Sequence, residues 1–187
     1  TPMVVAAPPF FYAFDNYASF KRNLSVTNPR EKMAYVGSND GLLHAFSLKD
    51  GKEKWAFLPY SLQARLNLAA NGGEYDMCSS AYCHQYLLDG SPQVADVYGK
   101  FGGTDQWRTI LMIGQRAGGT AYTALDVTSG ESPDPSNSDP AKFLWEFTDA
   151  ELGETWADPA IERVADATGQ AGAATWGVFF GSGYHEV

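Results

Sequence analysis

Residues 35–46 read Tyr35-Val36-Gly37-Ser38-Asn39-Asp40-Gly41-Leu42-Leu43-His44-Ala45-Phe46. Two apolar runs flank a polar turn, and the first run ends in glycine. Asn39-Asp40-Gly41 supplies residues that tolerate a positive φ angle, which a tight hairpin requires. The stretch therefore predicts two antiparallel strands joined by a short turn.

The same plan recurs along the chain. Three segments open on a proline and reach an apolar run that ends in glycine: Pro2 to Gly37, Pro92 to Gly114 and Pro159 to Gly181. The second and third intervals both span 22 positions. The first two copies continue through a further strand into a glycine turn and a tryptophan-containing strand: residues 43–46, Gly51 and residues 55–57, then residues 122–125, Gly130 and residues 145–147. Each complete copy is expected to hold four short strands.

Four short strands that recur with glycine turns are typical of β-propeller blades, in which each small sheet buries its faces against its neighbours. We expect an all-β fold, a fragment of a propeller with quinoprotein-like four-stranded antiparallel blades and long loop insertions. A β-sandwich with coincidental glycine turns is the alternative, and the matched intervals argue against it.

Turn and packing residues occupy matching places in the copies. The expected blade turns are Asn39, Asp40, Gly41, Asp50, Gly51, Gly118, Gly119 and Gly130. The expected blade-packing residues are Trp55, Trp145 and Trp156, because a large ring can fill the wedge between two twisted sheets.

The copies divide the chain into a first blade at about residues 1–59, an insertion at 60–88, a second blade at about 89–149 and the start of a third at about 156–187. Any helix is expected near residues 61–70. Propellers usually close four to eight blades into a ring. We therefore expect this sequence to be part of a longer protein whose other blades are its neighbours.

A further insertion, around residues 10–30, lengthens the first copy and is rich in aromatic residues. It contains Phe10-Phe11-Tyr12-Ala13-Phe14, followed by Tyr17 and Phe20. This cluster fits either a plug buried against the next blade, which we favour, or a patch that binds a partner.

Charge and hydropathy argue against nucleic acid as a partner and against a membrane span. The formal charge of -9 argues against nucleic acid, whose binding needs clustered Lys and Arg. The longest near-apolar run, residues 3–14, is broken by Pro8-Pro9 and is too short to span a bilayer. No membrane span is expected.

An ordered series of motifs resembles the C-terminal propeller of type IV pilus tip-associated adhesins, the PilY family. The series begins with residues 35–46 and Gly51-Lys52-Glu53-Lys54-Trp55-Ala56-Phe57-Leu58-Pro59, and continues through Leu88-Asp89-Gly90-Ser91-Pro92, Trp107-Arg108-Thr109, Gly118-Gly119, Ala124-Leu125-Asp126-Val127-Thr128, Leu144-Trp145-Glu146-Phe147-Thr148-Asp149, Leu152-Gly153-Glu154-Thr155-Trp156 and Gly181-Ser182-Gly183-Tyr184. The first block also resembles pyrroloquinoline quinone enzymes and outer-membrane assembly scaffolds, whereas the ordered series is specific. Ser47 departs from the pattern, because the second copy has Asp126 at the corresponding place.

The resemblance implies a non-enzymatic factor that supports attachment, pilus biogenesis and twitching motility. It places the protein outside the cell, at the pilus tip and associated with the outer membrane. The implied partners are pilus subunits or minor pilins and a host or abiotic surface. In that oxidising setting Cys78 and Cys83 are expected to form a disulfide.

No catalytic, cofactor or metal site is predicted in this segment, although calcium elsewhere in the full-length protein fits the family. Asp134, Asn137 and Asp139 only partly mimic a calcium loop, because Pro135 and Pro140 stiffen it and no bidentate Glu follows.

The alternatives are a fragment of a pyrroloquinoline quinone-dependent dehydrogenase and an outer-membrane assembly scaffold. The enzymes carry a disulfide between adjacent cysteines, whereas Cys78 and Cys83 are five positions apart. The available carboxylates lie at turns or strand ends, where Asp ordinarily caps a turn: Asp40, Asp126, Asp149 and Asp158. His44, His84 and His185 show no metal-ligand spacing. A scaffold needs no catalytic residue, so that alternative stays open.

Overall fold

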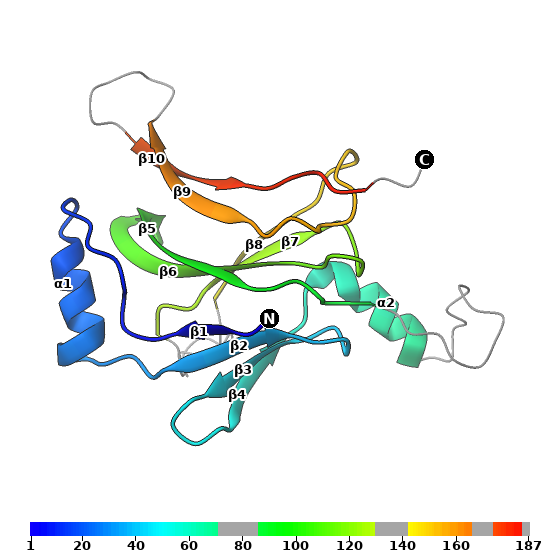
Figure 1. Ribbon diagram of the computed structural model, residues 1–187, viewed down its shortest axis with the longest axis horizontal. Coiled ribbons are helices and arrows are strands. Elements are labelled where there is room, and N and C mark those ends of the chain that lie inside the picture. The colour runs from blue at the N-terminus through cyan, green and yellow to red at the C-terminus, as the bar shows by residue number, and fades with distance from the viewer. Residues whose placement is uncertain (71–85, 130–141, 166–173, 185–187) are drawn as a thin grey trace.

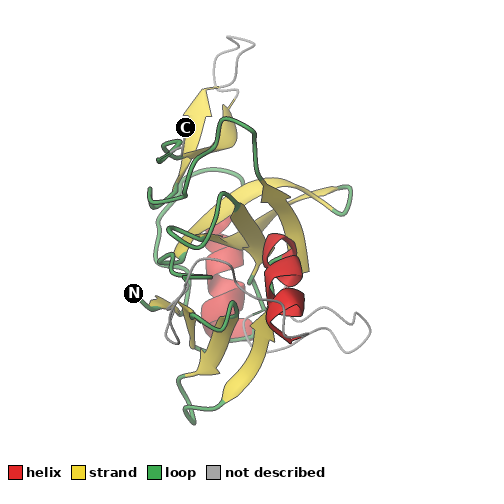
Figure 2. Ribbon diagram, turned by 90° about the vertical axis from the view of Figure 1, so that its right-hand side faces the viewer, coloured by secondary structure: helices red, strands yellow, loops and turns green. Residues whose placement is uncertain are grey.

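The computed structural model describes residues 1–70, 86–129, 142–165 and 174–184. Within these residues the chain forms two four-stranded antiparallel sheets and one two-stranded sheet, stacked one above the other in an open array (Figure 1). Strands dominate the fold, as Figure 2 shows. The predicted all-β propeller fragment is confirmed.

The strands follow chain order within each sheet. The first sheet contains β1 (Met3–Val5), β2 (Met33–Gly37), β3 (Leu43–Ser47) and β4 (Glu53–Phe57), and the second contains β5 (Gln93–Phe101), β6 (Thr104–Gly114), β7 (Tyr122–Asp126) and β8 (Lys142–Phe147). The third sheet pairs β9 (Ala160–Ala165) with β10 (Ala174–Phe179). The second sheet lies between the other two (Figure 1).

The two complete sheets share an irregularity that the sequence did not reveal. The third and fourth strands shift register after Ala45 in the first sheet and after Ala124 in the second. Ala45 pairs with Trp55, and Ala124 pairs with Trp145. A small residue therefore faces a large ring at the same place in both repeats, next to a bulge that increases the local twist.

Strand β6 is buried on both faces because its sheet is the middle one. Leu111 and Ile113 join the core shared with the first sheet, where Met33, Tyr35 and Leu43 pack. Ile110 and Met112 belong to a second core that Ile161 and Val178 of the third sheet contact. A strand covered on both sides carries a continuous apolar run, and residues 110–113 are such a run.

Two helical segments lie at opposite ends of the stack (Figure 1). Helix α2 (Tyr60–Ala70) lies in the predicted place. The sequence did not predict α1 (Tyr17–Arg22), which continues directly as the π-helical turn η1 (Asn23–Thr27). Asp15 and Asn16 precede α1 with φ angles of 48° and 55°, a conformation that these two residue types tolerate better than most. Among the described residues no helix has the length and apolarity to cross a membrane.

Candidate functional site

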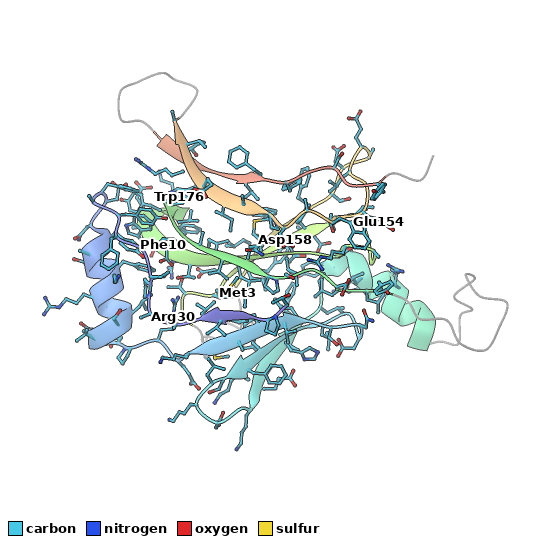
Figure 3. The ribbon with its side chains drawn as sticks, viewed as in Figure 1. Met3, Phe10, Arg30, Glu154, Asp158 and Trp176 are labelled. Carbon is cyan, nitrogen blue, oxygen red and sulfur yellow. The ribbon has the colours of Figure 1, made fainter. Side chains whose placement is uncertain are left out.

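The aromatic insertion, residues 10–30, packs around Trp107 on β6. The Tyr12 ring stacks on Trp107 with centroids 5.3 Å apart and an interplanar angle of 7°. Tyr17 meets Trp107 edge-on at 4.7 Å, and so does Trp176 of β10 at 6.0 Å. Stacked and edge-to-face pairs at these separations add stability beyond the area they bury. The insertion therefore joins the second sheet to the third at the α1 end, where Figure 3 shows Phe10 and Trp176.

The two sides of this insertion differ in exposure. Tyr17 is only 1% exposed, which confirms the predicted plug for the inner side. Trp107 also binds the insertion by donating its indole N–H to the carbonyl of Asp15 at 2.8 Å. On the outer side Phe11 is 88% exposed and Phe10 is 39% exposed. The same aromatic run therefore both fills the core and presents rings to solvent.

A buried hydrogen-bonded network ties the insertion to the second sheet. The Tyr17 hydroxyl donates to Asp96 Oδ2 at 2.6 Å, and the Thr109 hydroxyl donates to Asp96 Oδ1 at 2.7 Å. Arg30 Nη1 donates to the same Thr109 oxygen at 2.7 Å, and Arg30 Nε donates to the carbonyl of Ala6 at 2.9 Å. All four side chains are more than nine-tenths buried. Every member of the network thus has a partner with suitable chemistry.

Arg30 and Asp96 carry opposite charges in this network. Burial lowers the pKa of the Arg30 guanidinium, and the Asp96 carboxylate opposes that shift. Burial, then the hydrogen bond to Asp96, raises the pKa of Tyr17, so its hydroxyl remains a donor. A buried charge is tolerated when it is paired and hydrogen-bonded and is costly when isolated. Each of the two charges therefore depends on the other.

The sequence did not predict this network. One signal was present, since Asp96 is an acidic residue inside the otherwise apolar segment Val94-Ala95-Asp96-Val97. No local pattern identified Arg30 as its counter-charge, because 66 positions separate the two residues.

Helix α2 is fastened to the second sheet through its first turn. Glu146 on β8 accepts hydrogen bonds from the backbone N–H groups of Ser61 at 2.8 Å and Tyr60 at 3.1 Å. Such N–H groups lack partners inside a helix, and a carboxylate suits the positive end of the helix dipole. Gln115 also donates to the Ser61 hydroxyl at 2.5 Å. The helix that follows the first sheet in sequence is therefore positioned by the second.

The starts of the three sheets meet at Arg116. Its Nη2 donates to Ser91 Oγ and to Asp158 Oδ1, both at 3.3 Å. The Thr1 amine donates to the same Ser91 oxygen at 3.1 Å. Thr1, Ser91 and Asp158 each precede a proline that opens a copy of the repeat. Arg116 therefore contacts the second and third of these segments directly, and the first reaches it through Ser91.

The predicted turn residues of the first sheet lie in its two hairpin turns. Gly41 and Gly51 have φ angles of 89° and 70°. Asp40 and Asp50 each accept a hydrogen bond from the backbone N–H two residues further on, at 3.0 and 3.1 Å. Asn39 lies beside Asp40 in the first of these turns.

Gly118 and Gly119 lie where neighbouring atoms leave no room for a side chain. A Cβ on Gly118 would come within 1.8 Å of the Leu87 carbonyl oxygen. A Cβ on Gly119 would come within 2.0 Å of Gln115 Oε1.

The three predicted packing tryptophans have different surroundings. Trp55 is 7% exposed in the core between the first two sheets. Trp145 is 38% exposed and lines a cavity with Ile161 and Trp176 of the third sheet. Trp156 is 46% exposed on a loop and donates its indole N–H to Glu154 at 2.6 Å. The common packing role assigned to all three remains a prediction.

The strand-end carboxylates have structural partners. Asp126 and Asp149 each accept the backbone N–H two residues on, at 3.0 and 2.9 Å. The His44 imidazole lies between Asp40 at 2.9 Å and Glu53 at 3.0 Å. Across the described ranges no three His, Cys, Asp or Glu residues are grouped so that they could hold a metal ion.

Several predicted residues lie outside the described part of the chain. They are the cysteine pair, one turn glycine, two histidines and the loop compared with a calcium site: Cys78, Cys83, Gly130, His84, His185, Asp134, Asn137 and Asp139.

A family described as the PilY1 beta-propeller domain matches residues 6–186. The chain belongs to this family.

Two relatives of the family illustrate how far the likeness extends. The type IV pilus biogenesis factor PilY1 of Pseudomonas aeruginosa strain UCBPP-PA14 is 36% identical over 176 residues, which cover 90% of this chain and 12% of that protein. A type IV pilus biogenesis factor PilY1 homolog of Xylella fastidiosa strain Temecula1 is 36% identical over 171 residues, or 89% of this chain and 12% of that protein. The chain therefore spans about an eighth of the length of these relatives.

A solved structure shows the same fold. The crystal structure of the Pseudomonas aeruginosa PilY1 C-terminal domain superposes with a TM-score of 0.65 at 31% identity. The superposition covers 97% of this chain and 31% of that one. The sheets described above thus form part of a PilY1-type propeller.

Proposed function

We propose that this chain is a propeller portion of a non-enzymatic type IV pilus biogenesis factor. The observation that carries the proposal is the family match over residues 6–186, together with relatives named as pilus biogenesis factors. The chain spans a small part of those relatives, so the role is inferred for the whole protein from this part.

The chemistry of the described residues supports a scaffold role. Asp126 and Asp149 accept backbone hydrogen bonds at strand ends. Asp96 holds the insertion against the second sheet, and Glu146 holds α2. These carboxylates maintain the shape of the sheets and the position of the insertions, which is what a protein that presents loops from a rigid framework needs.

We assign the finer roles from the resemblance to the PilY family. The protein acts at the cell surface, at the pilus tip and associated with the outer membrane, and it supports attachment and twitching. Its partners are pilus subunits or minor pilins and a host or abiotic surface. In that oxidising setting Cys78 and Cys83 form a disulfide.

The test is a deletion of the gene, complemented with the wild-type gene. Surface pili counted by electron microscopy, attachment to a solid surface and twitching zones are all expected to fall in the deletion strain and to recover on complementation. Immunogold labelling of a tagged protein is expected to mark pilus tips. Normal piliation, attachment and twitching in the deletion strain would overturn the proposal. Pyrroloquinoline quinone-dependent dye reduction by the purified protein would overturn its non-enzymatic part.

A further inference from the structure

The outer side of the aromatic insertion forms a groove that lies outside the hydrophobic core. The groove lies between the segment that holds Phe10 and Phe11 and the helical segment α1–η1, and its volume is about 480 Å³. Phe11 and Val26 line it and are 88% and 70% exposed. Exposed apolar side chains that are rimmed by polar residues are typical of interaction sites.

Lys21 and Tyr12 contact the segment that carries the exposed ring of Phe11. Lys21 Nζ lies 3.4 Å from the centroid of the Phe11 ring and donates a hydrogen bond to the carbonyl of Phe10 at 3.1 Å. Phe10 stacks on Tyr12 at 5.4 Å, and Tyr12 stacks on buried Trp107. These contacts hold the backbone beside Phe11 and leave its ring exposed at the groove, where a large apolar side chain can serve as an anchor for a partner.

The rim of the groove is basic on an acidic protein. Lys21 and Arg22 both line it, whereas the chain as a whole carries a formal charge of -9. The Arg22 side chain is exposed in the last turn of α1. The Ser25 hydroxyl, also in the lining, is buried and has no hydrogen-bond partner among the described residues. Cationic and apolar groups are therefore both available to an occupant.

We propose that this groove binds an acidic segment of a partner protein. The segment inserts one or two large apolar side chains between Phe11 and Val26 and places carboxylates against Lys21 and Arg22. Complementarity of charge selects an acidic occupant. A segment fits better than an anionic bilayer, because the surface is concave and the net charge of the chain opposes approach to anionic lipid. The proposal does not depend on the pilus role.

A peptide selection identifies the occupant's chemistry without assuming its name. The full-length protein is immobilised and used to select from a random 12-residue phage-displayed library. The enriched peptides are synthesised, and their Kd is measured by fluorescence polarisation with the wild type and four variants. Phe11→Ser and Arg22→Glu alter the groove. The control variants Leu48→Ser and Lys52→Glu also replace an apolar residue with serine and reverse a positive charge, at exposed positions on the hairpin between β3 and β4.

The enriched peptides are expected to combine a net negative charge with at least two large apolar residues. Phe11→Ser should weaken their binding about 10-fold or more, as loss of an anchor residue does. Arg22→Glu should weaken it about fivefold or more and reduce its salt dependence. Both controls should stay within about twofold of the wild type.

Four outcomes would overturn the proposal. They are failure to enrich any peptide, enrichment of neutral or basic peptides, equal binding by Phe11→Ser, and equal binding by Arg22→Glu. Two parallel measurements separate other occupants. Phe11-dependent pelleting with phosphatidylcholine–phosphatidylglycerol vesicles would assign the groove to lipid. Phe11-dependent self-association in sedimentation velocity would assign it to a second copy.

Discussion

Replacing Asp96 with alanine is expected to destabilise the protein by about 2–6 kcal/mol, because two buried hydroxyls lose their acceptor at about 1–3 kcal/mol each. The substitution removes the acceptor for the Tyr17 and Thr109 hydroxyls and leaves the Arg30 guanidinium buried without its counter-charge. Since globular domains are stable by only about 5–15 kcal/mol, the loss would be a large fraction of the total. Urea unfolding followed by tryptophan fluorescence measures it.

Two further variants separate charge from packing. Asp96→Asn keeps the volume and one acceptor oxygen but removes the charge, so we expect a smaller loss than with alanine. Adding Arg30→Met to Asp96→Asn removes the uncompensated cation, and the double variant should be more stable than the sum of the single losses predicts, by about 0.5–3 kcal/mol. The matched control is Asp158→Ala, because Asp158 is half exposed and pairs with Arg116 at the surface, where such a pair contributes about 0–1 kcal/mol.

The reasoning fails if Asp96→Ala costs no more than the Asp158→Ala control. It also fails if the Asp96→Asn and Arg30→Met losses are additive, since the two charges would then not be coupled in the folded state.

Two more predictions concern a glycine in a turn, Gly118, and a histidine in a strand, His44. Gly118→Ala should lower the urea midpoint of unfolding strongly, because the new Cβ would lie 1.8 Å from a backbone carbonyl oxygen. The control variant Gly99→Ala should change the midpoint little, because the nearest atom to its new Cβ is a ring atom at 3.7 Å. Similar midpoints for the two variants would contradict the close approach at Gly118. Burial lowers the pKa of His44, but the hydrogen bonds to Glu53 and Asp40 outweigh burial and leave that pKa raised above 6.5. The contribution of His44 is therefore complete below about pH 6.5 and is lost as pH rises through the raised value. The wild type should lose up to about 1 kcal/mol more than His44→Gln between about pH 5.5 and pH 8.5, and parallel profiles would refute the assignment.

Hairpins and their recurrence could be predicted because they depend on neighbouring residues. Asp40 and Gly41 are a turn by their own chemistry, and the apolar run at 110–113 that ends in Gly114 indicates a strand. Helix α2 could also be placed, since it lies in an insertion between two recognisable blades. These features need no knowledge of which distant segments meet.

The surroundings of each side chain were decided only by the tertiary structure. Trp55 and Trp145 occupy the same repeat position opposite an alanine, yet one is 7% exposed and the other 38%, because different sheets face them. Helix α1 escaped prediction because its buried face is Tyr17, whose partners Asp96 and Trp107 are brought to it by the stacking of the second sheet. The chain by itself determined turns, strands and their repetition through short-range chemistry. Burial, charge pairing and the exposed groove required long-range contacts, which local sequence patterns do not encode.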